Sequence, residues 1–318
     1  MLLRRVISVH SLARPCYSTR VLRKQSILMN DTDGIQRPLR CLDVGDRDDQ
    51  NPIVFLGGTA QSIDTFSCHV RAMSKSRRLI VPELRCQGET KLLSEYATIQ
   101  QHVDDVEQLL THLGVYTPLN EATSRSVDLV GFSFGGRVGA AVAAYRPQMV
   151  HRLSVTGIPL HRPAMGSSIM HSWLASLKLG EMKSCYWSFL VNGYSEGFIE
   201  RYESQLPKFI ENIERSNPRP EQLVDLLENS LLDGDNGNED FRVPACASRI
   251  HCPVQVIGAT HDRIAGADSV RELAEYIGAG ASFVEIEGGH LAPFEMPVEW
   301  RNHVMAFLSR EEEVLTSP

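Results

Sequence analysis

The sequence lacks closely spaced cysteine pairs. Its seven cysteines are scattered over 318 residues, at positions 16, 41, 68, 86, 185, 246 and 252. A disulfide framework uses an even set of cysteines, and a structural zinc site uses ligands at short spacing. The pattern therefore favours reduced thiols in a reducing compartment over either kind of site.

Positive charge is scarce beyond the N-terminus. The chain carries 32 lysines and arginines against 39 acidic residues, which gives a formal charge of −7. The first 24 residues hold six of the basic side chains and no acid, so removing these six charges leaves −13 on the remainder. Binding phosphates requires a basic surface. The acidic body of the chain therefore disfavours a nucleic-acid partner.

A long apolar run is also missing. The longest uncharged stretch near the N-terminus, Val6 to Ala13, is far too short to span a bilayer. No later apolar segment approaches the length that a membrane-spanning helix needs. We therefore expect no stable membrane insertion. Residues 1–24 are rich in arginine and free of acids, which is typical of an organelle-import presequence. They predict import into the mitochondrial matrix, with a plastid or the cytoplasm as alternative locations, and a disordered basic tail as the alternative interpretation.

From residue 53 onward, short apolar runs alternate with helical patterns. This order predicts an α/β fold, in which a mostly parallel sheet is flanked by helices on both faces. The clearest helix is Tyr96–Leu113, which Gly114 follows as a stop. Before residue 53, two runs flank the turn-forming residues 31–34 and predict an antiparallel hairpin at the sheet edge. The predicted strands are Ser26–Asn30, Pro38–Val44, Ile53–Leu56, Leu79–Pro82, Val127–Gly131, Leu153–Thr156, Val254–Gly258 and Phe283–Glu287.

The alternation stops after Ile158, and no strand-like run returns until Val254. Four helices are expected in this interval, around residues 164–178, 181–192, 195–215 and 219–232. Insertions at the carboxyl ends of parallel strands carry function. We therefore interpret residues 161–244 as a helical cap, or lid, over an active site, with residues 25–160 and 245–310 as the core. The alternative is a separate helical domain with no part in catalysis.

The sharpest motif is a G-x-S-x-G sequence that begins at Gly131, between an apolar strand and a helix of small residues. A serine in a tight strand-to-helix turn projects its hydroxyl clear of the backbone, and the cramped turn requires glycine on either side. Gly131 and Gly135 supply that room, while Gly136 and Gly139 let the helix pack closely on the sheet. Ser133 is therefore the candidate nucleophile, and an ordinary tight turn is the alternative.

A serine hydroxyl is a poor nucleophile until an imidazole takes its proton, so a histidine is required later in the chain. His290 follows the last predicted strand and is the candidate general base. Asp262 stands just beyond the strand Val254–Gly258 and is the candidate carboxylate that holds the histidine tautomer. Asp268 is the nearest competitor, although its place at the start of a helix suits an acid that complements the helix dipole. His261 is not expected to act, because its side chain points elsewhere.

A glycine-rich loop follows the strand Ile53–Leu56. Negative charge that develops on a substrate oxygen needs preorganised backbone donors. Such a set of donors is called an oxyanion hole, and we assign it to the amides of Thr59 and Phe134, with Gly58 as the alternative donor in the loop. A simple turn that ends the strand is the other interpretation.

With these residues assembled, the chain resembles the α/β-hydrolase superfamily, of the serine-nucleophile type with a helical cap, over about residues 26–310. Pro82–Thr90 is similar to the stretch of that family written D-x-R-G-x-G-x-S. Gly289–Pro297 resembles its C-terminal histidine segment. The departures are Gly57, Glu83 and Cys86, where the family commonly has histidine, aspartate and glycine.

The resemblance implies a serine hydrolase that cleaves a carboxylic ester or thioester of a small to medium, partly apolar substrate through an acyl-enzyme, without a metal or cofactor. An elbow serine distinguishes the chain from haloalkane dehalogenases and epoxide hydrolases, which use aspartate there. Gly131–Val138 is also similar to the menaquinone-pathway synthase of the superfamily. The first alternative is therefore a carbon–carbon bond hydrolase or such a lyase, with cap arginines that hold carboxylates. The second is a ligand receptor without turnover. The arginines of interest are those that could bind such a carboxylate: Arg137 in the helix after the elbow, and Arg162, Arg201, Arg215, Arg219 and Arg242 in the cap. For Arg137, the alternative is an exposed position on the surface of its helix.

Overall fold

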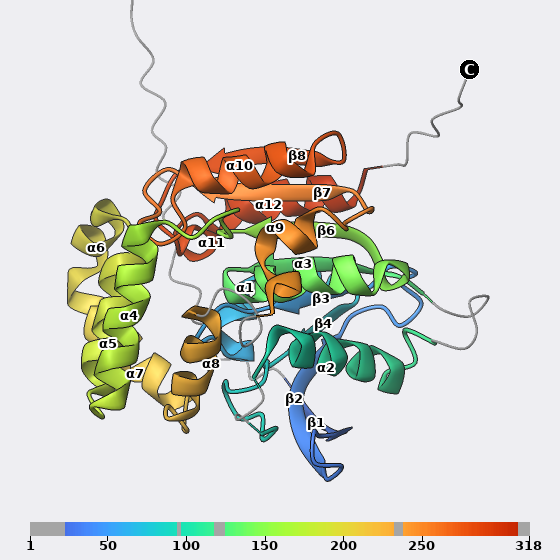
Figure 1. The fold of residues 1–318 in the computed structure, drawn as a ribbon, viewed down its shortest axis with the longest axis horizontal. Helices are drawn as coiled ribbons and strands as arrows, with labels where there is room; N and C mark the ends of the chain where they lie inside the picture. The colour runs from blue at the N-terminus through green and yellow to red at the C-terminus, as the bar shows by residue number, and fades with distance from the viewer. Residues whose placement is uncertain (1–22, 94–96, 118–124, 232–237, 311–318) are drawn as a thin grey trace, which may run out of the picture.

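The structure, a computed structural model, describes residues 23–93, 97–117, 125–231 and 238–310. They form an eight-stranded sheet in the order β1-β2-β4-β3-β5-β6-β7-β8, with helices on both faces (Figure 1). Strand β2 is antiparallel to β1 and β4, and every other pair is parallel. The α/β fold class is therefore confirmed. The strands are β1 Gln25–Asn30, β2 Gln36–Val44, β3 Ile53–Leu56, β4 Leu79–Pro82, β5 Val127–Phe132, β6 Val150–Thr156, β7 Val254–Ala259 and β8 Ala281–Ile286.

The central strands are buried on both faces, which explains their uninterrupted apolar sequences. Successive side chains of a strand point to opposite faces. In β3, Ile53 and Phe55 accordingly join one hydrophobic cluster and Val54 and Leu56 join the other. Because these strands are parallel, their carboxyl ends meet at the same edge of the sheet.

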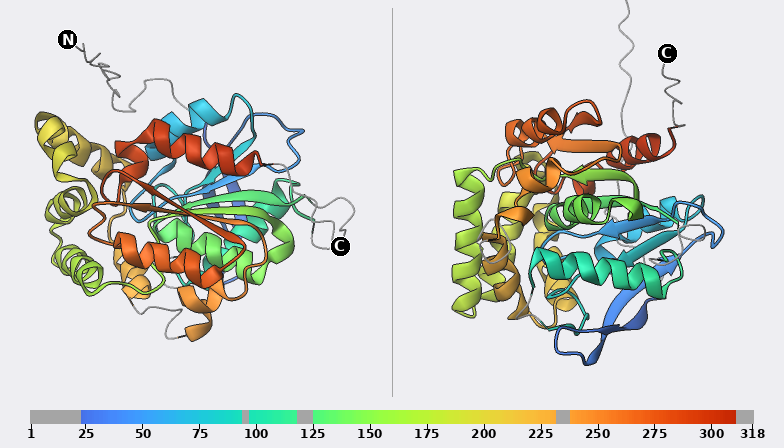
Figure 2. Two further views of the ribbon diagram at one scale, coloured as in Figure 1. Left: turned by 90° about the horizontal axis from the view of Figure 1, so that it is seen from above. Right: turned by 45° about the vertical axis from the view of Figure 1, so that its right-hand side comes forward.

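Helices α2, α3 and α10 cover one face of the sheet, and α1 and α12 cover the other (Figure 2). The helices of these two layers are α1 Ser67–Met73, α2 Ile99–His112, α3 Phe134–Tyr145, α9 Val243–Ala247, α10 Ala267–Ile277, α11 Ala292–Glu295 and α12 Pro297–Leu308. Short 3₁₀ turns are η1 Ile63–Phe66, η2 Pro147–Met149, η3 Glu203–Gln205 and η4 Glu239–Phe241. Helix α2 begins later than predicted, because the Thr98 side chain accepts a hydrogen bond from the Gln101 amide and caps the helix there. The expected start, Tyr96, lies outside the described residues.

The hairpin at the sheet edge forms as predicted. Asp31 accepts a hydrogen bond from the Gly34 amide at 2.9 Å, and Gly34 takes a φ of 78° that suits glycine. A buried arginine then ties the hairpin to the core. Arg85 donates to the carboxylates of Asp31 and Asp105, each at 2.7 Å. Because both carboxylates face one guanidinium, the charge buried at this edge is compensated.

Of the six described α-helices between β6 and β7, α9 packs on α3, and the other five lie across the carboxyl ends of the parallel strands (Figure 1). We refer to them as the cap helices: α4 Ala164–Lys178, α5 Met182–Gly193, α6 Glu196–Tyr202, α7 Leu206–Ser216 and α8 Gln222–Leu231. The single helix expected over 195–215 is wrong, because the chain forms α6, a 3₁₀ turn and α7 instead. Pro207 explains the break, since proline has no amide hydrogen to continue a helix but fits well in a first turn.

The predicted presequence, residues 1–24, lies outside the described residues except for its last two. Of these, Lys24 donates to the Asp64 carboxylate at 2.7 Å. No helix in the described parts of the chain is both long enough and apolar enough to cross a bilayer.

Candidate active site

Ser133 occupies the sharp turn between β5 and α3. Its backbone has φ 51° and ψ −118°, a conformation that costs a residue other than glycine about 1–3 kcal/mol. The strain is held by the neighbouring strand, because the Ser133 amide donates to the Thr156 carbonyl at 2.9 Å. The hydroxyl is thereby fixed at the sheet edge, in front of the N-terminus of α3.

The glycines of the motif are required by backbone crowding. A Cβ on Gly131 would lie 2.6 Å from the Gly135 carbonyl oxygen, and a Cβ on Gly135 would lie 2.2 Å from the Leu56 carbonyl oxygen. At Gly136 the closest atom is the Ile158 methyl group at 2.7 Å. The turn therefore packs against the next strand with no space for a side chain.

We expect Gly135→Ala to destabilise the fold by about 3 kcal/mol or more, because the added methyl group meets only backbone atoms, which cannot rotate away. Gly139→Ala, on the same helix, is the matched control. Its methyl group would meet the Leu153 side chain at 3.3 Å, and alanine favours the helix by about 1 kcal/mol. Urea unfolding of the two variants measures the difference, and equal midpoints would contradict the crowding argument.

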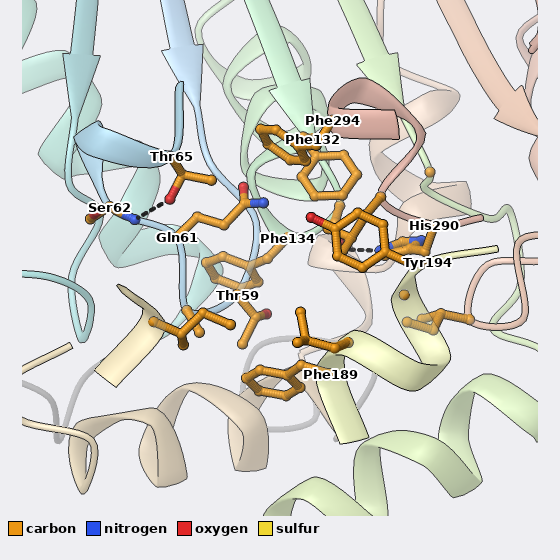
Figure 3. A pocket seen from close by; sticks show the side chains of 18 of the residues that line it. Thr59, Gln61, Ser62, Thr65, Phe132, Phe134, Phe189, Tyr194, His290 and Phe294 are labelled. Atoms are coloured by element: carbon orange, nitrogen blue, oxygen red, sulfur yellow. Dashed lines mark hydrogen bonds between the residues drawn. The ribbon is translucent and has the colours of Figure 1, made fainter. Parts of the chain in front are cut away.

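The structure brings together Ser133, His290 and Asp262, which are far apart in the sequence. His290 Nε2 lies 2.8 Å from Ser133 Oγ, and His290 Nδ1 lies 2.8 Å from Asp262 Oδ2. The His290 ring stands at the wall of the pocket (Figure 3). His290 and Asp262 are both buried. The three groups form one hydrogen-bonded chain from a carboxylate to a hydroxyl.

The environment of Asp262 keeps it charged. Burial raises the pKa of its carboxyl group, but attraction to His290, the hydrogen bond with that ring and two backbone donors outweigh burial, so the pKa is lowered overall. The donors are the amides of Ile264 and Ala265, each 2.8 Å from Oδ1. Asp268 lies in the first turn of α10. The exposed His261 pairs with Glu287 at 2.7 Å.

Gly157 is a site residue that the sequence analysis missed. It has φ 66°, and a Cβ there would lie 3.1 Å from His290 Cε1 and 3.2 Å from His290 Nδ1. Glycine at this position lets the imidazole approach the end of β6 closely. Its place at the carboxyl end of a strand beside the serine was the available signal.

The loop after β3 presents its backbone to Ser133. Gly58 is packed so closely that a Cβ there would lie 3.2 Å from Ser133 Cβ. The Gly58 amide donates to Gln61 Oε1 at 2.7 Å, so Gly58 is not available as the alternative oxyanion donor. Among the described residues, the amides of Thr59 and Phe134 donate to no protein acceptor. Phe134 also begins α3, where the helix dipole favours negative charge.

A cavity of about 820 Å³ lies between Ser133 and the cap helices. Aromatic side chains from the core and the cap form much of its wall (Figure 3). Apolar cap residues on the wall are Met170, Trp173, Phe189, Leu190, Phe198 and Phe209. An apolar wall with a few convergent polar groups is typical of a small-molecule site.

Three of the six arginines of interest line this cavity: Arg137, Arg162 and Arg215. Arg137 is buried, so its alternative place on a helix surface is wrong. Arg137 and Arg162 both donate to the Ser230 carbonyl, at 3.2 and 2.6 Å. Arg219 instead donates to the Thr90 carbonyl. Positive charge therefore gathers at the side of the cavity formed by α8.

Solved structures with this fold include MGS-M2, an alpha/beta hydrolase enzyme from a Medee basin deep-sea metagenome library. It is 20% identical, has a TM-score of 0.77 and aligns over 90% of this chain and 98% of its own. The enol-lactonase from Burkholderia xenovorans LB400 is 21% identical, has a TM-score of 0.74 and aligns over 89% of this chain and 100% of its own. At these identities the likeness shows the fold.

A curated relative is similar in sequence. It is the pyrrolizixenacetamide deacetylase of Xenorhabdus hominickii, 29% identical over 185 residues. The match covers 58% of this chain and 66% of the deacetylase, so it spans slightly less than two thirds of that protein. The model of the Alpha/beta hydrolase family matches residues 53–302, most of the described core and cap. The chain therefore belongs to the alpha/beta hydrolase family.

Proposed function

We propose that this alpha/beta hydrolase is a serine hydrolase that cleaves a carboxylic ester or thioester through an acyl-enzyme. The observation that carries the proposal is the chain of two 2.8 Å hydrogen bonds from Asp262 through His290 to Ser133. A buried carboxylate on one side of an imidazole and a hydroxyl on the other are the groups that acyl transfer requires.

In the first half of the reaction, Ser133 Oγ attacks the acyl carbon and its proton moves to His290 Nε2. The negative oxygen that forms is stabilised by the amides of Thr59 and Phe134. His290 then gives the proton to the departing alcohol or thiol, which leaves the acyl group on Ser133. In the second half, His290 Nε2 takes a proton from water as the water oxygen attacks the acyl carbon. His290 then returns that proton to Ser133 Oγ, the bond between Oγ and the acyl carbon breaks, and the acid is released.

The cavity supports a small to medium, partly apolar substrate. Its volume of about 820 Å³ and its aromatic walls suit a molecule that buries most of its surface there. The names of the relatives agree with acyl chemistry, since a deacetylase and an enol-lactonase both break a bond to an acyl carbon. We further propose that the cap helices act as a lid that excludes water from this cavity.

A panel of p-nitrophenyl esters of graded chain length tests the proposal. We expect saturable release of p-nitrophenol, with the highest kcat/KM at short to medium acyl chains that the cavity accommodates. Binding of the esters without release of product would favour the alternative that the protein is a ligand receptor without turnover. Inertness toward every ester would contradict the proposal that it is an esterase.

The carbon–carbon bond hydrolase, or the related lyase, is the second candidate. It is favoured by Arg137 and Arg162, which lie together on the cavity wall and could hold a carboxylate. Activity on a vinylogous diketone or a cyclohexadiene substrate, with no activity on esters, would support this candidate over the first.

A further inference from the structure

Gln61 lies on the loop that carries the oxyanion donor Thr59. Its side chain is almost fully buried and lines the cavity. The carboxamide oxygen accepts from the Gly58 amide at 2.7 Å, and the Gln61 amide donates to the Gly58 carbonyl at 3.3 Å. Gln61 is therefore held against Gly58 by one bond of its side chain and one bond of its backbone.

The cap restrains the same loop. Asn217, just after α7, donates through Nδ2 to the Ala60 carbonyl at 3.0 Å. The Gln61 amide also donates to Gln87 Oε1 at 3.2 Å. With these contacts the loop cannot rotate without breaking hydrogen bonds to two other elements. The position of the Gln61 carboxamide is thus set before any ligand binds.

The orientation of that carboxamide follows from chemistry. A backbone amide is a donor, so the atom that faces Gly58 N must be the oxygen of the side chain. The nitrogen, Nε2, then points away from Gly58 and into the cavity (Figure 3). Among the described residues, Nε2 donates to no protein acceptor. It is a donor held toward the space that a ligand would fill.

This donor lies beside the nucleophile. Gly58, which contacts the Gln61 carboxamide directly, packs against Ser133 Cβ and the Phe132 ring. The surrounding wall is aromatic, with Phe132, Phe134 and Phe294 on the cavity surface (Figure 3). A ligand that displaces water from such a place must supply an acceptor, because a buried donor without one is unfavourable.

We propose that Gln61 Nε2 binds a second, uncharged oxygen of the substrate, a keto or ether oxygen within a few bonds of the scissile carbonyl. The substrate class is then an ester or thioester with an oxygen substituent near the reacting carbon. This inference rests on the proposed hydrolase function and adds a substrate preference to it. Thr59 and Phe134 already serve the reacting oxygen, so Gln61 serves a different one.

Isosteric ester pairs test the proposal. p-Nitrophenyl methoxyacetate and butyrate differ by an oxygen in place of a methylene on the acyl side, and 2-methoxyethyl acetate and butyl acetate differ likewise on the alcohol side. The measured quantity is the ratio of kcat/KM for the ether to that for the alkyl ester. Intrinsic reactivity cancels when one ratio is compared between variants.

The test variant is Gln61→Glu, which has the same shape. One carboxylate oxygen still accepts from the Gly58 amide, while the other replaces the donor. We expect the ratio to fall about tenfold for at least one pair, and that pair identifies the side of the substrate that Gln61 contacts. Asn212→Asp, on the cavity wall in α7, is the matched control, since it adds the same charge and should leave both ratios unchanged.

The outcomes separate this proposal from the one on which it rests. If the wild type turns the esters over and Gln61→Glu leaves both ratios of kcat/KM unchanged, the role of Gln61 is overturned, whatever the loss in absolute rate. The proposal that the protein is a serine hydrolase would stand. No turnover of any of the four esters by the wild type would overturn both. Equal fluorophosphonate labelling of the wild type and Gln61→Glu shows that the variant retains a folded site.

Discussion

Replacement of Ser133 by alanine is expected to lower kcat for p-nitrophenyl esters by about 10⁶-fold. The change removes the only atom of residue 133 that can attack the substrate, and it leaves His290 without the hydroxyl that lies 2.8 Å from Nε2. Alanine tolerates the backbone conformation of the turn no better and no worse than serine does. The fold should therefore persist, and the loss of rate should be chemical.

Labelling with a fluorophosphonate measures this prediction directly, because the reagent phosphonylates an activated serine. The wild type should be labelled and Ser133→Ala should not. Ser230→Ala is the control, since Ser230 also lies on the cavity wall but its hydroxyl has no hydrogen-bond partner within the described residues. Equal labelling of the wild type and Ser133→Ala would refute the assignment of the nucleophile.

The strands and the elbow could be predicted because their signals are local. Val127–Phe132 is an apolar run, and the glycines at 131 and 135 are required by contacts within a few residues or with the adjoining strand. The break in the helix expected over 195–215 is local as well. Pro207 is its local signal, because proline fits the first turn of α7 but cannot continue a helix from the residues before it.

The contact of Gly157 with His290 and the role proposed for Gln61 could not be predicted from the sequence, although Gly157 does stand at the carboxyl end of a strand. Each depends on a neighbour that is distant along the chain: Gly157 lies against His290, and Gln61 lines the cavity beside Ser133. The same holds for Arg137. Helical spacing places it on α3, but only the position of the cap helices decides whether that face is exposed or buried.

Two of the three departures from the family pattern, Glu83 and Cys86, have a structural explanation. Cys86 has φ 67°, a left-handed conformation that favours glycine, the residue the family commonly has there. Glu83 is buried, and its carboxylate accepts from the amides of Ile63 and Glu89 at 3.2 and 2.7 Å. Gly88 leaves room for the longer side chain, because a Cβ there would lie 2.3 Å from Glu83 Oε2. Glu83 also lines the cavity, but its carboxylate bonds to the backbone amides of the loops and not to Ser133, His290 or Asp262.

Asp262→Asn is expected to lower kcat by about 10⁴-fold while the protein stays folded. The amides of Ile264 and Ala265 donate to Oδ1 and will hold the oxygen of the asparagine in that place. Its nitrogen must then face His290 Nδ1. Two donors cannot share that contact, so the imidazole proton moves to Nε2, and the ring can no longer accept a proton from Ser133.

Control of the His290 tautomer and a simple loss of negative charge at Asp262 lead to different results for Asp262→Ala. Asp262→Ala removes the carboxylate without placing a donor against Nδ1, so part of the imidazole keeps the productive tautomer. We therefore expect kcat of the alanine variant to exceed that of the asparagine variant, although alanine leaves the Ile264 and Ala265 amides without their acceptor and lowers stability. Steady-state kinetics with urea unfolding of both variants measures the two effects. A higher kcat for Asp262→Asn would mean that the charge of Asp262, and not its control of the His290 proton, dominates its role.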